Sequence, residues 1–233
     1  MSRVVVVTGS SKGLGLAIAK YFLAQGDQVF GLSRSISTLT HDRYTHSEVD
    51  VTDEKAVSAF FKGLRQATRK VDILVNNAGI ASMNAFATTP YSTFQNILNV
   101  NVLGTALCCQ KAFGLLKRST APRIINFSTV AVPLLLEGEA AYAASKSAVE
   151  TFTKVLAKEY GHFKITCNAV GPSPIDTDLV RSVPKEKLEA LIQKQAIKQM
   201  ATDADVLNVI GFFSQPESHM ITGQTIYLGG VSA

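Results

Sequence analysis

The chain has 233 residues, of which 46% are hydrophobic and 18% are charged, as is typical of a globular protein with one domain or at most two small ones. The net charge is +5, but lysine and arginine are scattered without a basic run between aromatic residues, which argues against a nucleic-acid-binding protein. The 3 cysteines include an adjacent pair and no CxxC, so the sequence indicates neither a disulfide framework nor a metal site.

The N-terminal sequence MSRVVVVTGS contains an apolar run that is too short for a signal peptide, and no later stretch is long and uncharged enough to span a bilayer. We therefore expect a cytoplasmic protein with no membrane partner and no nucleic-acid partner. A positive balance without a basic patch favours attraction to anionic small molecules or to an acidic carrier.

Short β-branched runs alternate with longer segments of helical periodicity along the whole chain, beginning with RVVVVTG and LGLAIAKYFLAQG. The predicted strands cover residues 3–9 and 28–33, a segment that ends near Asp50, and residues 71–75, 123–127, 164–170 and 224–228. The predicted helices cover residues 14–26, 53–68, 90–117 and 141–160, with further helical stretches within 184–213.

Several of these strands are continuous apolar runs, which is typical of a parallel sheet covered by helices on both faces. No linker-like block, low-complexity tract or repeat divides the chain. We predict a single α/β domain over residues 1–233, built on a doubly wound parallel β-sheet of about seven strands. Ligands of such sheets bind beyond the carboxyl ends of the strands, so functional residues are expected in the turns that follow the strands.

The turn after the first strand reads TGSSKGLG and carries Gly9, Gly13 and Gly15 between a valine-rich strand and an alanine-rich helix. Positive φ, close approach of the main chain to a pyrophosphate and tight packing of the helix all require a residue without a Cβ. The free N–H groups at the start of the helix suit phosphate. The turn therefore predicts a dinucleotide site, which also includes Ser11, Lys12 and Leu14.

The end of the second strand indicates which dinucleotide binds. An acidic residue about 20 positions after the glycine turn would bind the ribose 2′-hydroxyl of NAD. The sequence there is GLSRS, with Ser33 and Arg34. Arg34 and Lys12 together offer two positive charges to a 2′-phosphate, which favours NADP(H) over NAD(H) as the cofactor.

From Val4 to about Gly230 the chain resembles the short-chain dehydrogenases/reductases, a family with a Rossmann-like fold. The resemblance rests on motifs in the family's order, which are TGSSKGLG, Asp50-Val51, NNAG at 76–79, Asn101 in NVNVLG, Tyr142 and Lys146 in YAASK, and IDTD at 175–178. Besides the glycine turn, it implies cofactor contacts at Asp50, Val51, Asn77, Ala78, Gly79, Tyr142, Lys146, Pro172, Ile175 and Thr177.

The Tyr-x-x-x-Lys pattern occurs twice. Tyr142 and Lys146 lie within AAYAASKSAVETF, where the i, i+4 spacing places both side chains on one face of a helix. Tyr160 and Lys164 have the same spacing, but Gly161 follows the tyrosine and a strand is expected to begin near Lys164. The second pair therefore straddles a helix end, and we select the first.

A carbonyl that accepts hydride also needs a proton, and a phenol with an unperturbed pKa of about 10 supplies it poorly at neutral pH. A nearby ammonium lowers the pKa of the phenol. By resemblance, Tyr142 is the general acid/base, and Lys146 lowers its pKa and holds the nicotinamide ribose. Asn101 supports a proton-relay water near the lysine, or alternatively is a helix-interior amide that binds the main chain.

Ser128 and Thr129 end the fifth predicted strand in NFSTVA. The family usually has a serine hydroxyl 13 residues before the tyrosine, where it hydrogen-bonds the substrate carbonyl, and that position is Thr129 here. Successive side chains of a strand point to opposite faces, so only one of the two hydroxyls should face the cleft. We assign the catalytic role to Thr129, and expect Thr129→Ala to lower kcat/KM about tenfold to a thousandfold while Ser128→Ala changes little.

The segment VGPSPIDTD has Pro172-Ser173 where the family usually has Pro-Gly, which places an additional side chain beside the expected nicotinamide pocket. Ile175 and Thr177 still match the positions that meet the carboxamide. The charged segment that follows is expected to form a substrate lid at about 179–200.

These residues predict an NADPH-dependent oxidoreductase that reduces a ketone to a secondary alcohol, with a small carbonyl or alcohol compound as its substrate. Within the family the chain looks most similar to the 3-oxoacyl-acyl-carrier-protein reductases, which act on a carrier-bound thioester. A sugar or free-ketone dehydrogenase is the alternative among enzymes. A non-catalytic NADP(H)-sensing or scaffolding protein is the alternative from another class.

Basic residues lie near the region where such reductases engage an acidic carrier, namely Lys117, Arg118, Arg123 and Lys164. The positions where arginine is expected hold Thr120 and Phe163, which weakens the acyl-carrier assignment. The resemblance also implies a homotetramer or a dimer, with the helices over 90–117 and 141–160 at one interface.

Overall fold

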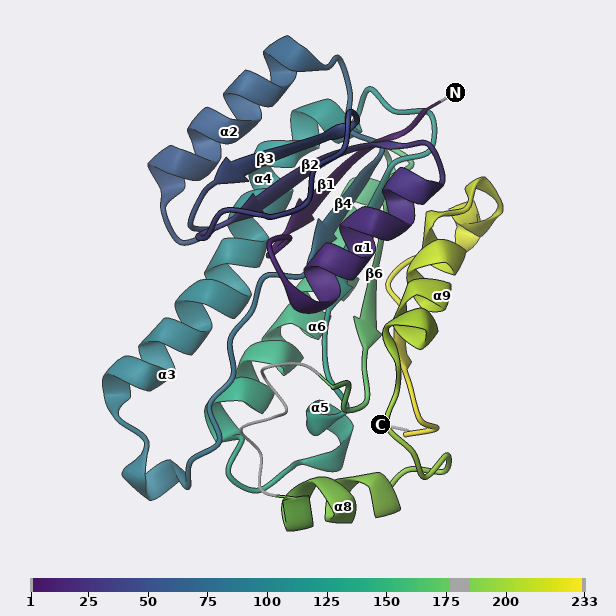
Figure 1. The fold of residues 1–233 in the computed structure, drawn as a ribbon. Coiled ribbons are helices and arrows are strands. Elements are labelled where there is room, and N and C mark those ends of the chain that lie inside the picture. The colour runs from purple at the N-terminus through teal and green to yellow at the C-terminus, as the bar shows by residue number, and fades with distance from the viewer. Residues whose placement is uncertain (1, 177–184, 232–233) are drawn as a thin grey trace.

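A computed structural model describes residues 2–176 and 185–231 of the chain. Its centre is a parallel sheet of seven strands in the order β3-β2-β1-β4-β5-β6-β7, which is the doubly wound arrangement that the sequence predicted (Figure 1). The strands are β1 Val4–Thr8, β2 Gln28–Ser33, β3 Tyr44–Glu48, β4 Ile73–Asn76, β5 Arg123–Phe127, β6 Thr166–Gly171 and β7 Thr225–Tyr227.

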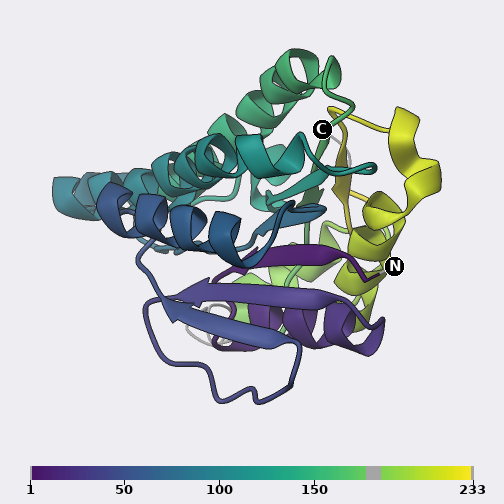
Figure 2. The same cartoon turned by 90° about the horizontal axis from the view of Figure 1, so that it is seen from above.

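Helices cover both faces of the sheet, as Figure 2 shows from above. One face packs against α2, α4 and α6, and the opposite face packs against α1 and α9. The main helices are α1 Gly13–Ala24, α2 Glu54–Ala67, α3 Tyr91–Leu98, α4 Thr105–Leu116, α6 Ala140–Gly161, α8 Lys185–Gln193 and α9 Asp203–Ser214. The shorter pieces are η1 Phe86–Thr88, η2 Asn99–Gly104, α5 Ala131–Leu134 and η3 Pro216–Met220.

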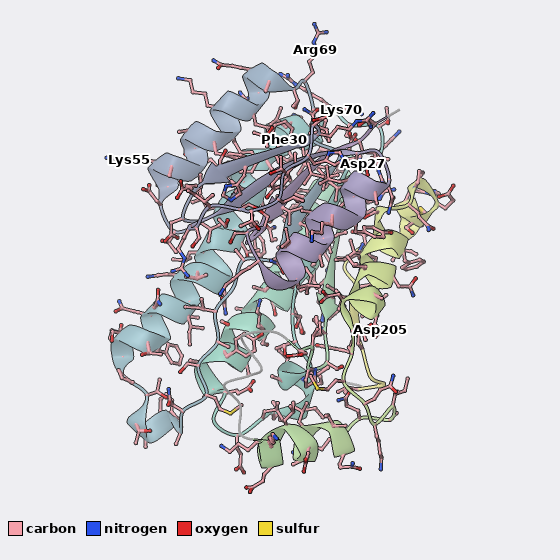
Figure 3. The ribbon with its side chains drawn as sticks, in the orientation of Figure 1. Asp27, Phe30, Lys55, Arg69, Lys70 and Asp205 are labelled. Carbon is pink, nitrogen blue, oxygen red and sulfur yellow. The ribbon has the colours of Figure 1, made fainter. Side chains whose placement is uncertain are left out.

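The valines of β1 show why a continuous apolar run is needed here. Val4 and Val6 enter the core on the α2, α4 and α6 face, whereas Val5 and Val7 enter the core beneath α1 and α9. A strand buried on both faces has no solvent side, so alternation with polar residues would place a polar side chain in a core. Charged side chains such as Lys55 and Arg69 instead point away from the molecule (Figure 3).

The helix predicted over 90–117 has an interruption that the sequence did not reveal. Residues 99–104 form a π-helical segment, η2, between α3 and α4. Such segments occur most often at functional sites. At its end Gly104 lies against Val51, and a Cβ at this glycine would lie 2.7 Å from a Val51 methyl group.

One further boundary differs from the sequence prediction. The sixth strand begins at Thr166 because Lys164 has a left-handed φ of 60°, which ends the loop after α6. The tyrosine of the rejected pair, Tyr160, lies in the last turn of α6, so that pair does straddle a helix end. Among the described residues, none of the helices combines the length and the hydropathy that a bilayer crossing requires.

Candidate active site

A cleft of about 730 Å³ opens at the carboxyl ends of the strands. This volume lies within the usual range of small-molecule and cofactor sites. Residues from every motif that the sequence singled out line it, namely Gly9, Ser11, Lys12, Gly13, Leu14, Gly15, Ser33, Arg34, Asp50, Val51, Asn77, Ala78, Gly79, Thr129, Tyr142, Lys146, Pro172 and Ile175. Asn101 does not line the cleft, and Thr177 lies outside the described residues.

The glycine turn at the end of β1 can form only because its glycines have no side chains. A Cβ at Gly15 would lie 2.0 Å from the carbonyl oxygen of Gly9, so the start of α1 approaches the turn more closely than any other residue would allow. Gly9 and Gly13 have φ values of 69° and 53°, in the left-handed region that favours glycine. The turn therefore presents main chain and a helix N-terminus to the cleft, which suits a pyrophosphate.

The turn after β4 is tied to the glycine turn by side-chain hydrogen bonds. Asn77 donates its amide to the Thr8 and Gly9 carbonyl oxygens over 3.0 and 3.3 Å. The Ala78 N–H donates to the Thr8 hydroxyl over 2.9 Å. These contacts fix the NNAG motif beside the site for the dinucleotide, with Gly79 facing the cleft.

The end of β2 contributes the charged groups that the sequence assigned to a 2′-phosphate. Arg34 is exposed and lines the cleft together with Lys12, which precedes α1. The Ser33 hydroxyl is less available, because it donates to the Ser35 carbonyl oxygen and lies 2.7 Å from Nε2 of His46. The described part of this site thus carries two cations, and Ser33 holds the turn.

The helix α6 carries the two candidate reaction groups on consecutive turns. Lys146 is buried, and its Nζ donates to the Phe127 carbonyl oxygen over 2.9 Å and lies 5.9 Å from the centre of the Tyr142 ring. Both side chains face the cleft that the glycine turn lines. The i, i+4 spacing has therefore brought a phenol and an ammonium together beside the nucleotide site.

The acid–base properties of this pair differ from the expectation. The pKa of Tyr142 is raised to about 12, mainly by burial and also by the Glu139 carboxylate, whereas the interaction with Thr129 acts to lower it. Burial also lowers the pKa of Lys146 to about 8. The net shift of the Tyr142 pKa is thus opposite to the expected lowering, because burial disfavours the charged form of the phenol.

The two hydroxyls at the end of β5 have different partners. The Thr129 hydroxyl accepts a hydrogen bond from the Ala131 N–H over 3.2 Å, and Thr129 lines the cleft with Tyr142, whose pKa it acts to lower. The Ser128 hydroxyl donates instead to the buried Glu150 carboxylate. Sheet pairing continues through Ser128, whose N–H donates to the Val170 carbonyl oxygen over 2.8 Å, so the two side chains point in different directions.

Asn101 lies behind the cleft, in the π-helical segment η2. It is fully buried, and its amide donates to the Ile80 carbonyl oxygen and the Ser145 hydroxyl, each over 2.9 Å. Its oxygen accepts from the Ile80 N–H over 2.9 Å. These bonds match the alternative in which the amide satisfies the main chain, and they join η2 to the turn after β4 and to α6.

The remaining part of the cleft is lined by residues that the sequence motifs did not identify. Apolar side chains dominate it, namely Met83, Leu135, Leu136, Leu188 and Leu191. Glu139 and Lys187 add opposite charges, and burial raises the pKa of Glu139 while Lys187 acts in the opposite direction. The position of Glu139, one turn before Tyr142, was the only sequence feature that could have indicated that this carboxyl group lies near the cleft.

The expected lid lies partly within the described residues. Residues 179–184 fall outside them, whereas α8 borders the cleft through residues at helical spacing, Lys187, Leu188, Ala190, Leu191 and Lys194.

One basic residue assigned to carrier binding is placed elsewhere. Arg123 is only 1% exposed and donates to the carbonyl oxygens of Pro122, Gln215 and Pro216. A buried guanidinium cannot meet an acidic partner, so this expectation is wrong. Lys117 lies over the rings of Phe113 and Phe163.

A phenol, an ammonium and a glycine turn that share one cleft at the carboxyl edge of a doubly wound sheet define a dinucleotide-dependent oxidoreductase. A family model described as enoyl-(acyl carrier protein) reductase matches residues 9–231. The chain belongs to the short-chain dehydrogenase/reductase family. It is accordingly an oxidoreductase of the ketone and alcohol type that uses a nicotinamide cofactor and a small-molecule substrate.

Relatives match along nearly the whole chain but differ in their substrates. The chain is 34% identical to 2-(R)-hydroxypropyl-CoM dehydrogenase of Xanthobacter autotrophicus, covering 99% of this chain and 98% of that one. It is 28% identical to a 3-oxoacyl-(acyl-carrier-protein) reductase of Vibrio harveyi, with 98% and 96% covered.

Solved structures show the same fold. Aldohexose dehydrogenase of Thermoplasma acidophilum superposes with a TM-score of 0.90 at 31% identity, covering 99% of this chain and 94% of that one. ElxO with NADP bound superposes with a TM-score of 0.89 at 26% identity, covering 98% and 97%.

Proposed function

We propose that the protein is an NADPH-dependent carbonyl reductase that converts a ketone into a secondary alcohol, with Tyr142 as the proton donor. The observation that carries this proposal is that Thr129, Tyr142 and the buried Lys146 line the same cleft as the glycine turn, with Nζ of Lys146 5.9 Å from the centre of the Tyr142 ring. This arrangement offers one hydroxyl to orient a carbonyl and a second hydroxyl to protonate it.

The raised pKa of Tyr142 sets its protonation state. A phenol with a pKa of about 12 keeps its proton at neutral pH, so the proton that reduction needs is present, but its release requires a nearby positive charge. The proton moves from the Tyr142 oxygen to the carbonyl oxygen of the substrate, where negative charge develops. Lys146 stabilises the resulting phenolate through its positive charge, and Asn101 positions η2 and Ser145 behind the lysine.

The residues present fit a nicotinamide dinucleotide. Gly9 and Gly15 leave a cradle that a Cβ would fill, and the start of α1 faces it. A bound cofactor of this kind would supply the hydride. The hydroxyl of its nicotinamide ribose would be held by Lys146, and Asp50 and Val51 would contact its adenine, as in the family.

The preference for NADP(H) is supported by Lys12 and Arg34, which both line the cleft. A 2′-phosphate would neutralise their charge, whereas NAD(H) would not. ElxO, a structural neighbour, has NADP bound. Pro172 and Ile175 line the opposite end of the nucleotide site, and we propose that they and Thr177 meet the carboxamide.

The substrate half of the cleft supports a substrate with a substantial apolar part, because leucine and methionine side chains line most of it. We propose that α8 is the described part of a lid over this half, within a single domain. Carrier-bound thioesters remain in the panel of test substrates because acyl-carrier relatives match the chain, but the burial of Arg123 reduces the basic surface for a carrier. Sugars are included in the panel of test substrates because the chain is structurally similar to aldohexose dehydrogenase.

Exposed apolar side chains on the outer helices support self-association. Tyr91 on α3, Leu103 in η2 and Val155 on α6 are 77%, 60% and 48% exposed. These residues lie on helices that the family packs between subunits. We propose a homotetramer or a dimer, which sedimentation of the purified chain would test.

The test is the oxidation of NADPH by the purified protein with a panel of an aliphatic ketone, an aldohexose and a β-ketoacyl thioester. Turnover that Tyr142→Phe lowers at least about a hundredfold supports the proposal. NADPH binding without turnover on any member would instead favour the non-catalytic sensor or scaffold. Parallel assays with NADH test the cofactor preference, since equal use would remove the proposed purpose of Lys12 and Arg34.

A further inference from the structure

Three consecutive turns of α6 contact three consecutive residues at the end of β5. Tyr142 lies beside Thr129 in the cleft, Lys146 donates to the Phe127 carbonyl oxygen, and the third side chain in the series, Glu150, accepts a hydrogen bond from the Ser128 hydroxyl. The i, i+4, i+8 spacing places these three side chains on one face of the helix. The first two are candidate reaction groups, whereas no role has been given to the third.

Glu150 is buried, with 7% of its surface exposed. A charged side chain at such depth needs hydrogen-bonding partners. Its Oε1 accepts from the Ser128 hydroxyl and, over 2.5 Å, from the Tyr227 hydroxyl. Both partners donate to one oxygen, so the carboxylate acts here as an acceptor that joins two hydroxyls.

The second hydroxyl extends the link to the edge of the sheet. Tyr227 belongs to β7, which pairs with β6, and its ring lies over Gly171. A Cβ at Gly171 would lie 2.3 Å from Cδ1 of Tyr227, so only glycine permits this approach. Glu150 thereby connects the end of β5 to β7 across β6.

Ser128 is the residue before Thr129, so its anchoring bears on the threonine hydroxyl. If the Ser128 side chain were released, the end of β5 would be held by its main-chain bond to Val170 and by the Lys146 contact. The direction of the next side chain depends on how the strand is held at this point, because neighbouring side chains point to opposite faces.

We propose that Glu150 is a positioning residue, which acts through Ser128 and Tyr227 to direct the Thr129 hydroxyl toward Tyr142. This inference rests on the proposed reductase activity. It adds to that activity a buried residue that does not itself line the cleft.

The first measurement compares Glu150→Leu and Glu150→Gln by steady-state kinetics with the ketone that the wild type reduces best. The glutamine oxygen still accepts both hydroxyl hydrogen bonds, so this variant should keep kcat/KM within about threefold, whereas leucine should lower kcat about tenfold with little change in the KM for NADPH. Exposed Glu159 on the same helix supplies the matched control, Glu159→Gln, which should match the wild type.

The second measurement separates positioning from stability. Glu150→Leu leaves two buried hydroxyls without an acceptor and is expected to lower Tm. Combining it with Ser128→Ala and Tyr227→Phe removes those hydroxyls and restores an apolar fit, so Tm should recover. Positioning requires kcat of this triple variant to stay lowered about tenfold, because the anchor is still missing.

The third measurement tests the route through the threonine. In a Thr129→Ala background, Glu150→Leu should cost less than about twofold further, since the group that it positions is already gone. Full additivity of the two losses would overturn the proposal, and so would recovery of kcat together with Tm in the triple variant. If the wild type reduces no ketone, the proposed function itself fails and the inference falls with it. An active wild type with an equally active Glu150→Leu would refute the inference alone.

Discussion

Replacing Thr129 with alanine removes the hydroxyl that meets Tyr142 in the cleft. Two effects of different size follow from its contacts. The hydrogen bond from the Ala131 N–H, of 3.2 Å, is lost, which costs about 1 kcal/mol of stability and lowers Tm by about 2–4 °C for a chain of this length. The loss of one donor to a developing oxyanion should lower kcat/KM about tenfold to a thousandfold, equivalent to about 1.4–4 kcal/mol in the transition state.

The assay is NADPH oxidation with the preferred ketone, performed alongside thermal unfolding. Thr129→Ser retains the hydroxyl and should stay within about fivefold of the wild type, apart from changes in substrate range as the methyl group is lost. Ser128→Ala should lose less activity than Thr129→Ala, because it removes only the hydroxyl that anchors to Glu150, whereas Thr129→Ala removes the substrate-binding hydroxyl itself. Greater sensitivity at Ser128 than at Thr129 would refute the assignment of the substrate-binding hydroxyl.

Further changes test the nucleotide site and the charge state of the lysine. Arg34→Asp should lower kcat/KM with NADPH at least about tenfold and raise kcat/KM with NADH, because a carboxylate repels the 2′-phosphate and binds the 2′-hydroxyl. An unchanged ratio of the two kcat/KM values would contradict the assignment of Arg34 to the 2′-phosphate. Lys146, with a pKa of about 8, is charged below that pH and neutral above it. The kcat/KM for reduction should therefore be level in acid and decline above about pH 8. A decline that begins only near pH 10 would contradict the assignment of this pKa to the catalytic lysine. Gly15→Ala should abolish NADPH binding in a fluorescence titration, since its Cβ would lie 2.0 Å from the Gly9 carbonyl oxygen. The control is Gly63→Ala within α2, where a Cβ would have no atom within 4 Å. NADPH binding should not change in this variant, and Tm should rise by a few degrees. A loss of NADPH binding in Gly63→Ala would show that Gly15→Ala acts nonspecifically.

The order of strands and helices could be predicted from the sequence because burial on both faces leaves a strong apolar signal in each strand. The valines of β1 and the runs in β4 and β5 show it most clearly. The π-helical segment η2 could not be predicted, because its side chains keep the apolar and polar pattern of an ordinary helix. The four residues of α5 include Pro133 and are followed by Leu135, whose φ is 48°, so they are too few and too irregular to show helical periodicity.

The candidate site was predictable wherever a short motif carries the chemistry, as at Gly9 or Tyr142. Residues that act through distant contacts were not. Glu139 and Glu150 lie on the same helix as Tyr142, yet nothing in the local sequence shows that one meets Lys187 across the cleft and the other meets Tyr227 on β7. The raised pKa of Tyr142 also depends on its burial, which spacing along a helix does not report.

The division of the cleft between structural elements has a consequence for engineering. The proposed proton donor, the ammonium and the proposed orienting hydroxyl all belong to α6 and the end of β5, and hydrogen bonds hold these two elements together. The apolar wall comes from separate segments, residues 135–136 and α8. Exchange of those segments with counterparts from another reductase would alter selectivity for bulky or charged ketones and leave the proton-transfer apparatus in its original framework.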